Sequence, residues 1–337
     1  MIDPAYSPQE ARGIWVFLEQ DAGVLAPVSL ELLAKARALA TESGAELTGL
    51  LVGGDLAALE ATAAKLDLDR VVSVAHPLLT QFTAEAYAHA VDQVIRTQKP
   101  DIFLLGATAY GRDLAGRLAV MLRTGLTADC TDLALEAGTG LLLGEVSGFG
   151  GGVLATIRCE QHRPQMATVR PGVFPEPAAA DRAAAKVERV NVDVPAAKCL
   201  VKVVARHRKT GVDISRAERL VVAGAGARGE MPNIEALAQA LGAEIGATRV
   251  AVDEGWAERE RQIGQTGVIA RPKLALVWGA SGASQFTCGI DQAEMVVAVN
   301  QDPEAAIFES ADICIVDEVA PVVKALVAEL QSHGGAE

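Results

Sequence analysis

A stretch rich in glycine and serine, WGASGASQFTCG at residues 278–289, follows a short apolar run and has the composition of a strand-to-helix turn. Such a turn brings backbone N–H groups close to a phosphate, and Ser281, Ser284 and Gln285 add neutral donors. The stretch lacks the lysine that a nucleotide-hydrolysing loop uses at its phosphates. It therefore predicts a site that binds a diphosphate-bridged ligand without hydrolysing it. The alternative is a plain helix entry with Ser281 as N-cap.

A second glycine-rich turn, LVVAGAGARGE at residues 220–230, begins like the G-x-G-x-x-G fingerprint of dinucleotide-binding folds, with Gly224, Gly226 and Gly229. The fingerprint of an NAD site continues with an acidic residue about 20 positions on, at the end of a second strand. No acidic residue ends an evident strand there, which counts against a standard NAD site. Tight packing at a strand–helix turn explains the glycines equally well.

Two further segments carry groups suited to a cofactor. Thr248 and Arg249 precede an apolar run that we expect to be a short strand, and a polar loop follows that ends in GQTG at residues 264–267. Arg249 could stabilise negative charge on a ring, or it could form a surface ion pair. Asn300 ends another predicted strand, where it could contact a ribose or adenine, or simply begin a turn with Asp302.

The composition excludes several classes of protein. The net charge of −13 argues against a nucleic-acid binder. The five cysteines form no C-x-x-C pair, so we expect neither a zinc site nor a disulfide framework, and the five histidines are scattered without a catalytic or metal-binding constellation. No apolar run is long enough for a membrane helix, and no signal-peptide pattern is evident. We therefore expect a metal-free cytoplasmic protein.

The elements that must position these groups form an α/β fold with two domains. The first 125 residues alternate strand and helix patterns, which predicts a nucleotide-binding-like parallel sheet covered on both faces. Strands at 141–146, 152–158 and 165–170 are expected to be antiparallel and to add to the edge of that sheet. We place an N-terminal domain at 1–205, a charged hinge at 206–217, and a doubly wound domain at 218–337.

Taken together, three C-terminal stretches give a specific signal. They are GATRVAVDEGW, QIGQTGVIARPKLALVWGASGASQ and AVNQDPEAAIFESADICIVDE, in this order and spacing. The chain resembles the alpha subunit of electron transfer flavoproteins in these stretches, which cover most of residues 218–337. The first domain matches more loosely, through its alternating pattern and through GLTADCTDL at 125–133, which looks like the family's threonine-rich turn.

The resemblance implies a C-terminal FAD-binding domain and a heterodimer with a beta subunit, which is similar to the first domain and carries AMP in many members. It implies an electron carrier, not an enzyme, which passes electrons from flavin dehydrogenases to a membrane quinone oxidoreductase or takes part in bifurcating chemistry. Two other functions stay open at this point. One is an NAD-dependent oxidoreductase built on the second glycine turn, and the other is an adenine-nucleotide-binding module without a redox role.

The resemblance also assigns residues to FAD. Arg249 would lie beside the flavin ring, the loop after Ile263 would contact the flavin and ribityl chain, and the turn after Ser281 would follow the flavin and diphosphate. The full set that it implies is Thr248, Arg249, Ile263, Gly264, Gln265, Thr266, Ser281, Gly282, Ala283, Ser284, Gln285, Phe286, Asn300, Glu318 and Val319.

The chain departs from the family pattern at two places. Phe286 stands where the family commonly has a histidine that can donate a hydrogen bond to the flavin. Loss of a hydrogen bond to a developing anion costs about 1.5–3 kcal/mol, so we expect the anionic flavin to be less stabilised here. Ala225 stands where the family often has arginine, and Arg228 is a candidate to replace it.

Overall fold

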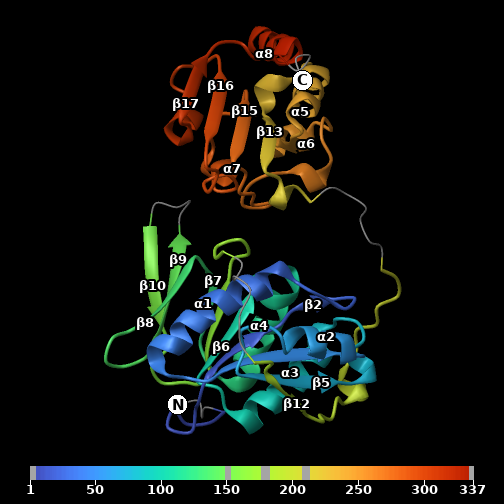
Figure 1. Ribbon diagram of the computed structural model, residues 1–337, viewed down its shortest axis with the longest axis vertical. Helices are drawn as coiled ribbons and strands as arrows, with labels where there is room; N and C mark the ends of the chain where they lie inside the picture. Colours follow the sequence, from blue (N-terminus) through green and yellow to red (C-terminus); the bar gives the residue numbers. More distant parts are fainter. Residues whose placement is uncertain (1–4, 149–152, 176–182, 207–212, 334–337) are drawn as a thin grey trace. The chain divides into compact units, whose positions relative to one another are not determined.

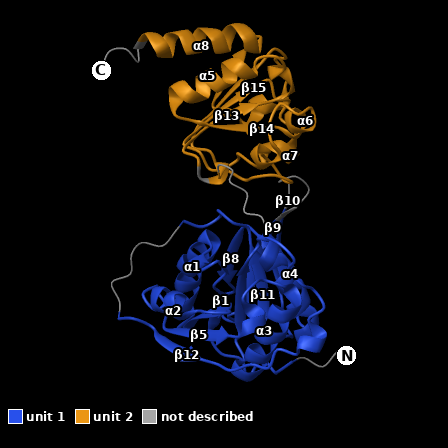
Figure 2. Ribbon diagram, turned by 90° about the vertical axis from the view of Figure 1, so that its right-hand side faces the viewer, with its two compact units in different colours: residues 1–207 blue, residues 208–337 orange. Residues whose placement is uncertain are grey.

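The computed structural model describes residues 5–148, 153–175, 183–206 and 213–333. The chain forms two compact units, Met1–His207 and Arg208–Glu337, which are coloured separately in Figure 2. Each unit has its own parallel sheet and its own apolar clusters. The predicted division at 206–217 stays a prediction, since residues 207–212 lie outside the described part of the chain.

The first unit is built on a seven-stranded sheet in the order β12-β5-β4-β1-β6-β11-β7, in which every neighbouring pair is parallel (Figure 1). Its strands are β1 (Ile14–Phe17), β4 (Leu47–Gly53), β5 (Arg70–Ala75), β6 (Ile102–Gly106), β7 (Leu126–Cys130), β11 (Gln165–Val169) and β12 (Lys186–Arg189). A small hairpin pairs β2 (Gln20–Asp21) with β3 (Val24–Leu25).

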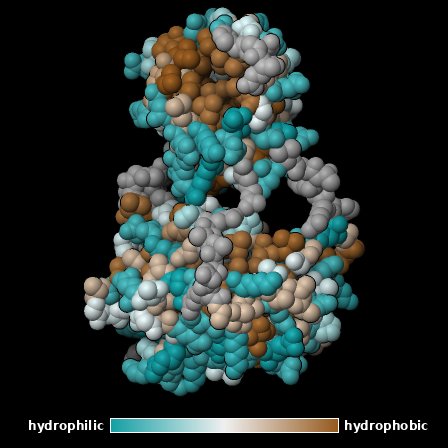
Figure 3. All heavy atoms as spheres, viewed as in Figure 1, coloured by the Kyte–Doolittle hydropathy of each residue, from teal (hydrophilic) through white to brown (hydrophobic). Residues whose placement is uncertain are grey.

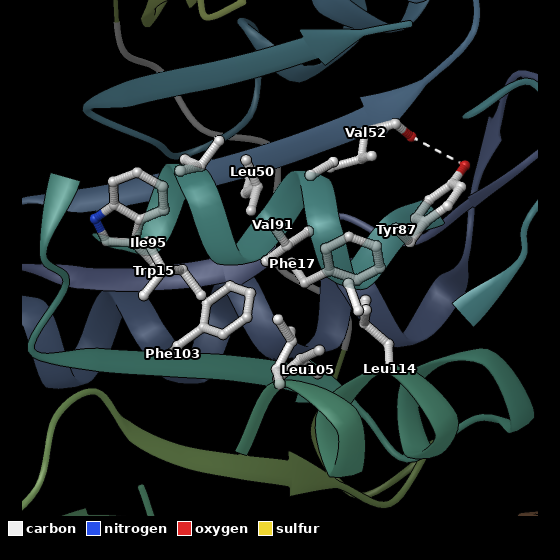
Figure 4. Packing of buried hydrophobic residues seen from close by; sticks show 14 of the residues in the cluster. Trp15, Phe17, Leu50, Val52, Tyr87, Val91, Ile95, Phe103, Leu105 and Leu114 are labelled. Carbon is white, nitrogen blue, oxygen red and sulfur yellow. Dashed lines mark hydrogen bonds between the residues drawn. The ribbon is translucent and has the colours of Figure 1, made fainter. Parts of the chain in front are cut away.

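Successive side chains of β1 point to opposite faces of the sheet, so the core of this unit has two layers. Trp15 and Phe17 pack on one face with Phe103 and with side chains of α3 and α4, as Figure 4 shows. Ile14 and Val16 pack on the other face, under α1 and α2. The helices are α1 (Pro27–Ser43), α2 (Ala57–Ala63), α3 (Ala84–Gln98) and α4 (Ala109–Leu122), with the short turns η1 (Pro77–Leu79) and η3 (Ala196–Lys198).

The strands that follow the first 125 residues correct one expectation. β9 (Leu142–Gly148) and β10 (Val153–Arg158) are antiparallel as predicted, but they form a separate three-stranded sheet with β8 (Asp132–Leu135). β11 is neither antiparallel nor at an edge, because it lies parallel between β6 and β7. Its two polar side chains fit this interior place, since Gln165 Oε1 accepts from the Leu142 amide and Thr168 Oγ1 accepts from the Asp129 amide.

The segment before the second unit is held on the first. The Glu85 carboxylate accepts hydrogen bonds from the backbone amides of Leu200 and Val201, at 2.6 and 3.0 Å. Arg206 pairs with Asp21. The chain therefore stays in contact with the first unit as far as residue 206.

The second unit is a five-stranded parallel sheet in the order β14-β13-β15-β16-β17. Apolar side chains of β13 and β15 alternate between a layer under α5 and α8 and a layer that contains Ile263, Phe286 and Ile307. The strands are β13 (Arg219–Ala223), β14 (Glu244–Ala247), β15 (Leu274–Trp278), β16 (Val296–Asn300) and β17 (Ile313–Val316). The helices are α5 (Met231–Leu241), α6 (Arg249–Asp253), α7 (Ser284–Thr287) and α8 (Val319–His333), with short turns η4 (Ile214–Arg216), η5 (Ala225–Ala227), η6 (Arg259–Arg261) and η7 (Ala306–Ser310).

The apolar run after Arg249 is a helix, and the expectation of a strand there was wrong. Residues 249–253 form α6, and the strand lies just before them as β14, paired with β13. β14 contains Gly246, on which Ile263 packs so closely that a Cβ there would lie 2.3 Å from the Ile263 Cδ1. The strand thus depends on a tertiary contact that local sequence does not reveal.

β17 is the outer strand of this sheet, and two of its large apolar side chains are exposed to solvent. Ile313 is 48% exposed and Val316 is 55% exposed. Figure 3 shows hydrophobic residues gathered over β16 and β17. The strand contains no charged residue or proline.

Candidate functional site

A pocket of about 790 Å³ lies in the second unit, at the carboxyl ends of its strands. Its wall includes residues that follow β13, β14, β15 and β16, and Val319 at the start of α8. The chain reverses its direction of travel across the sheet between β13 and β15, and such a reversal is where open α/β sheets bind ligands. The volume lies within the range of about 300–1,000 Å³ that is usual for small-molecule sites.

The two glycine-rich turns meet at the base of this pocket. The Gly224 amide donates to the Trp278 carbonyl at 2.8 Å, and the Gly226 amide donates to the Gly279 carbonyl at 2.9 Å. A Cβ on Gly279 would lie 2.6 Å from the Gly226 Cα. Only glycine permits this approach of two backbones, so packing between the turns accounts for part of the fingerprint.

The turn after β15 is held open by contacts within the chain. Gly282 has φ +87°, and a Cβ there would lie 2.0 Å from the Ile307 amide nitrogen. Asn300 donates from Nδ2 to the Ala280 carbonyl at 2.8 Å and accepts the Asp302 amide at Oδ1. Asn300 thus both begins the predicted turn and fixes the glycine-rich turn beside it. The alternative role of Ser281 as N-cap is wrong, because α7 begins only at Ser284.

The GQTG loop contributes Thr266 to the pocket wall and is equally tight. The Val268 amide donates to the Gln262 carbonyl at 2.7 Å, and the Gly267 amide donates to the Gly264 carbonyl at 2.9 Å. A Cβ on Gly264 would lie 2.1 Å from the Gln285 carbonyl oxygen, and one on Gly267 would lie 2.2 Å from the Gln262 carbonyl oxygen. The loop is therefore packed against the turn that contains Gln285.

Two buried polar atoms of the pocket wall lack a partner within the described residues. They are Thr248 Oγ1 and Gln262 Oε1, on side chains that are 9% and 2% exposed. A buried acceptor or hydroxyl without a hydrogen bond costs about 1–3 kcal/mol. A polar ligand in the pocket would remove this cost, so the wall fits a ligand with both donors and acceptors.

The charged groups of the wall are few and almost balanced. Arg249 is the basic lining residue, and Asp302 and Glu304 are the acidic ones. The Arg249 side chain is 72% exposed, and its Nε lies 3.3 Å from an oxygen of Asp253, so the surface ion pair considered from the sequence does form. The site therefore presents mainly neutral groups to a ligand.

Most residues predicted for FAD line this one pocket. Those that line it are Thr248, Arg249, Ile263, Thr266, Ser281, Gly282, Ala283, Gln285, Phe286, Asn300 and Val319. Gly264, Gln265, Ser284 and Glu318 do not line it, although Gly264 and Gln265 belong to its GQTG loop. Ala225 lines the pocket as well, whereas the exposed Arg228 does not.

Phe286 has a second role that the sequence did not indicate. Its side chain is 6% exposed and packs in the apolar layer with Ile263, Ile290 and Ile307. An aromatic ring at this position therefore adds to the core of the second unit. The expected effect of Phe286 on a bound flavin stays a prediction.

Gln262 was missed by the sequence prediction, although it lines the pocket and is the more deeply buried of the two side chains that have an unpaired polar atom. The signal was available in the spacing, because Gln262 and Thr266 flank a glycine in a segment that must turn sharply. Glutamine in a polar loop is normally exposed, and only the fold shows that this one is not.

The described residues contain neither a metal-binding cluster nor a membrane-spanning helix. No group of three or more His, Cys, Asp or Glu in this part of the chain could hold a metal ion. None of the described helices is both long and apolar enough to cross a membrane.

Comparison with known proteins identifies both units. Residues 14–195 match the family model described as the electron transfer flavoprotein domain. Residues 213–291 match the model described as the electron transfer flavoprotein FAD-binding domain, which contains the two glycine-rich turns and the GQTG loop.

Several curated relatives align over almost the whole chain. An electron transfer flavoprotein subunit alpha from Clostridium acetobutylicum is 39% identical, over 95% of this chain and 97% of the relative. A protein FixB from Clostridium saccharobutylicum is 40% identical, over 97% of this chain and 98% of the relative. An acryloyl-CoA reductase electron transfer subunit beta from Anaerotignum propionicum is 34% identical, over 94% and 95%.

Proposed function

Because this chain belongs to the family of electron transfer flavoprotein alpha subunits, we propose that its FAD is held in the pocket of the second unit. The observation that carries this placement is the pair of buried, unpaired polar atoms on Thr248 and Gln262 in the wall of a pocket at the strand reversal. FAD supplies the redox chemistry of the electron carrier, and the surrounding protein groups bind it and tune it.

The residues around the pocket have distinct tasks in this proposal. The turn at residues 279–283 provides a surface without large side chains, along which a diphosphate can approach the backbone. Thr248 and Gln262 offer neutral hydrogen-bonding groups. Arg249 can leave its exposed pair with Asp253 at little cost and face negative charge on the cofactor, because exposed ion pairs contribute about 0–1 kcal/mol.

We also propose a beta subunit as the partner of this chain. In the chain alone, Thr266, Ser281 and Gln285 are exposed although they line or border the pocket. A partner that covers them would exclude water from the cofactor. Flavin dehydrogenases are the proposed electron donors and a membrane quinone oxidoreductase is the proposed acceptor. The relative named as an electron transfer subunit of acryloyl-CoA reductase supports a reductase as redox partner.

The direct test is co-expression with the beta subunit and an absorption spectrum of the purified pair. We expect a yellow complex from which FAD is released on denaturation. A complex that is colourless, and remains so after incubation with FAD, would overturn the proposal. Binding of NADH, or of ATP or AMP by this chain in place of FAD, would instead favour the oxidoreductase or the nucleotide-binding module.

A matched pair of variants tests the location of FAD. Thr248→Val removes the unpaired hydroxyl of the pocket wall, and Thr48→Val makes the same change at a buried position of β4 in the first unit. We expect Thr248→Val to weaken FAD binding about three- to tenfold, the effect of one hydrogen bond. Thr48→Val is expected to leave the dissociation constant unchanged. Equal effects of the two variants would place FAD elsewhere.

A further inference from the structure

Residues 200–206 are the last described residues of the first unit, and they form a strap that contains no helix or strand. The strap is attached to the unit where it begins. The Glu85 carboxylate accepts the amide of Val201 and that of Leu200, and these hydrogen bonds lower the pKa of this carboxyl. The preceding Cys199 packs against an apolar cluster of the unit. The strap therefore begins at a firm attachment, with an ionised group holding two backbone donors.

The middle of the strap has no comparable attachment. The backbone of residues 202–205 forms no hydrogen bond with any other described residue. Val203 is 41% exposed and Val204 is 97% exposed, so this part buries little apolar surface. The middle of the strap therefore stays on the first unit only while its far end is held.

Arg206 holds that far end. Its Nη2 group contacts the Asp21 carboxylate in the β2–β3 hairpin and donates to the Tyr110 hydroxyl on α4 at 3.3 Å. The Tyr110 ring is itself supported, because it stacks on Phe82 with the ring centroids 4.3 Å apart. The side chains of Arg206 and Asp21 are 41% and 43% exposed, and exposed ion pairs are weak and are screened by salt. The contact at Arg206 therefore opens more readily than the attachment at Glu85.

We propose that the contact of Arg206 with Asp21 is a salt-sensitive clip that sets the length of chain connecting the two units. When the clip is closed, the first unit holds the chain as far as Arg206, and when it is open, only as far as Val201. In the second unit, Ile214 is 1% exposed and belongs to an apolar cluster. Opening adds residues 202–206 to the connection, which is at most about 17 Å of extended chain. The inference goes beyond the proposed function, because the clip acts whatever the pocket binds.

Distances between spin labels on the two units test the clip in the complex with the beta subunit. The labels are attached to a ketone-bearing amino acid at the exposed positions of Glu42 and Glu309, which leaves the native cysteines in place. Asp21→Asn should widen the distance distribution. High salt should widen that of the parent and change the variant little. Trypsin should cut after Lys202 about two- to fivefold faster in Asp21→Asn, because cleavage requires the strap to leave the surface.

A charge exchange and a matched control show whether this ion pair is responsible. Arg206→Glu should open the clip, and adding Asp21→Arg to the same chain should close it again. Asp113→Asn removes another exposed ion pair of the first unit, with Arg117, and should change neither measurement. Equal distance distributions for the parent and Asp21→Asn at low salt, or a charge exchange that fails to restore the parent distribution, would overturn the inference. These measurements do not require FAD, so a complex without FAD would overturn only the proposed function.

Discussion

The two parallel sheets of this chain end differently at their carboxyl edges. In the second unit, small residues follow the strands, and the edge opens into a pocket with unpaired polar atoms. In the first unit, the chain's own side chains occupy the edge. Val28 packs on Gly106 at the end of β6, where a Cβ would lie 2.6 Å from the Val28 Cγ1. Glu19 accepts from the Thr108 hydroxyl at 2.6 Å, and Thr108 Oγ1 accepts the Gly111 amide.

At a second place on the first sheet, paired side chains of the chain itself again occupy the space where a ligand could bind. The Glu60 carboxylate accepts the Ser73 hydroxyl at 2.7 Å and the guanidinium of Arg189, beside a smaller space of about 280 Å³. The comparison teaches that a parallel sheet supplies a location for a site but not the site itself. A ligand is favoured where polar groups are left for it, and at these two places of the first unit Glu19 and Glu60 have hydrogen-bond partners within the chain.

The largest effect is expected from a substitution in the glycine-rich turn after β15. Gly282→Ala places a Cβ against the backbone of Ile307 at a positive φ, so we expect the second unit to lose at least about 3 kcal/mol of stability and the complex to lose FAD. Hydrogen exchange, measured by peptide, should rise in the second unit and stay unchanged in the first.

Gly255→Ala is the matched control for the cost of placing alanine at a positive φ. Gly255 also has a positive φ, of +77°, but a Cβ there would meet nothing within 4 Å. This variant should cost only about 1 kcal/mol, with FAD retained. Equal losses in the two variants would show that the close contact at Gly282 is unimportant.

An intermediate effect is expected when the paired carboxylate of Glu60 is removed from the first unit. Glu60→Ala leaves the buried Ser73 hydroxyl without its acceptor and should destabilise the first unit by about 2–3 kcal/mol at pH 7, without changing FAD affinity. Arg189 beside Glu60 lowers the pKa of this carboxyl, with Ser73 assisting. Its contribution is thus present above the ordinary glutamate pKa of about 4.3 and is lost as the pH falls through the lowered folded-state pKa.

Denaturant unfolding at several pH values measures this contribution. The difference between the parent and Glu60→Ala should shrink below pH 4, as the parent carboxyl becomes protonated. Glu60→Gln keeps an acceptor for Ser73 and should lose less stability than Glu60→Ala. A change in FAD affinity in either variant would contradict the separation of the two sheet edges.

The smallest effect is expected at Glu19, with the opposite sign. Burial raises the pKa of the Glu19 carboxyl, and the bond from Thr108 only partly opposes this. Ionisation therefore penalises the folded state as the pH rises above the ordinary glutamate value. Glu19→Gln should stabilise the first unit by less than about 1 kcal/mol at pH 7 and have no effect at pH 4, as measured by denaturant unfolding. The exposed Glu42→Gln should be neutral at both, and destabilisation by Glu19→Gln at pH 7 would show that the negative charge is required.

The parts of the fold that sequence predicted well are those with a strong local pattern. Buried runs such as β1, β4 and β6, and the amphipathic helix α3, carry their period in the residues themselves. β14 and α6 were misassigned because β-branched residues in α6 suggest a strand, while the actual strand has only Ile245 as a large apolar side chain. Pairing with β13 decided that assignment, which is a tertiary effect.

The candidate site follows the same division. Glycine turns and the residues of the family motifs could be predicted, because their types and order are visible in the chain. The burial of Gln262 and the packing of Phe286 into the core could not, since both depend on side chains that are distant in the sequence. Close backbone contacts, such as that between Gly226 and Gly279, are also invisible until the turns are placed together.

The open outer strand β17 has a consequence for how this protein is made. Within the described residues β17 pairs with β16 on one side and with no strand on the other, and it contains no charge or proline, so its outer edge is a template for pairing with another chain. Newly synthesised copies that have not yet bound a partner would associate through this edge. The rate of this association would grow with the square of their concentration. Slow expression at low temperature should therefore raise the yield of material that remains dispersed.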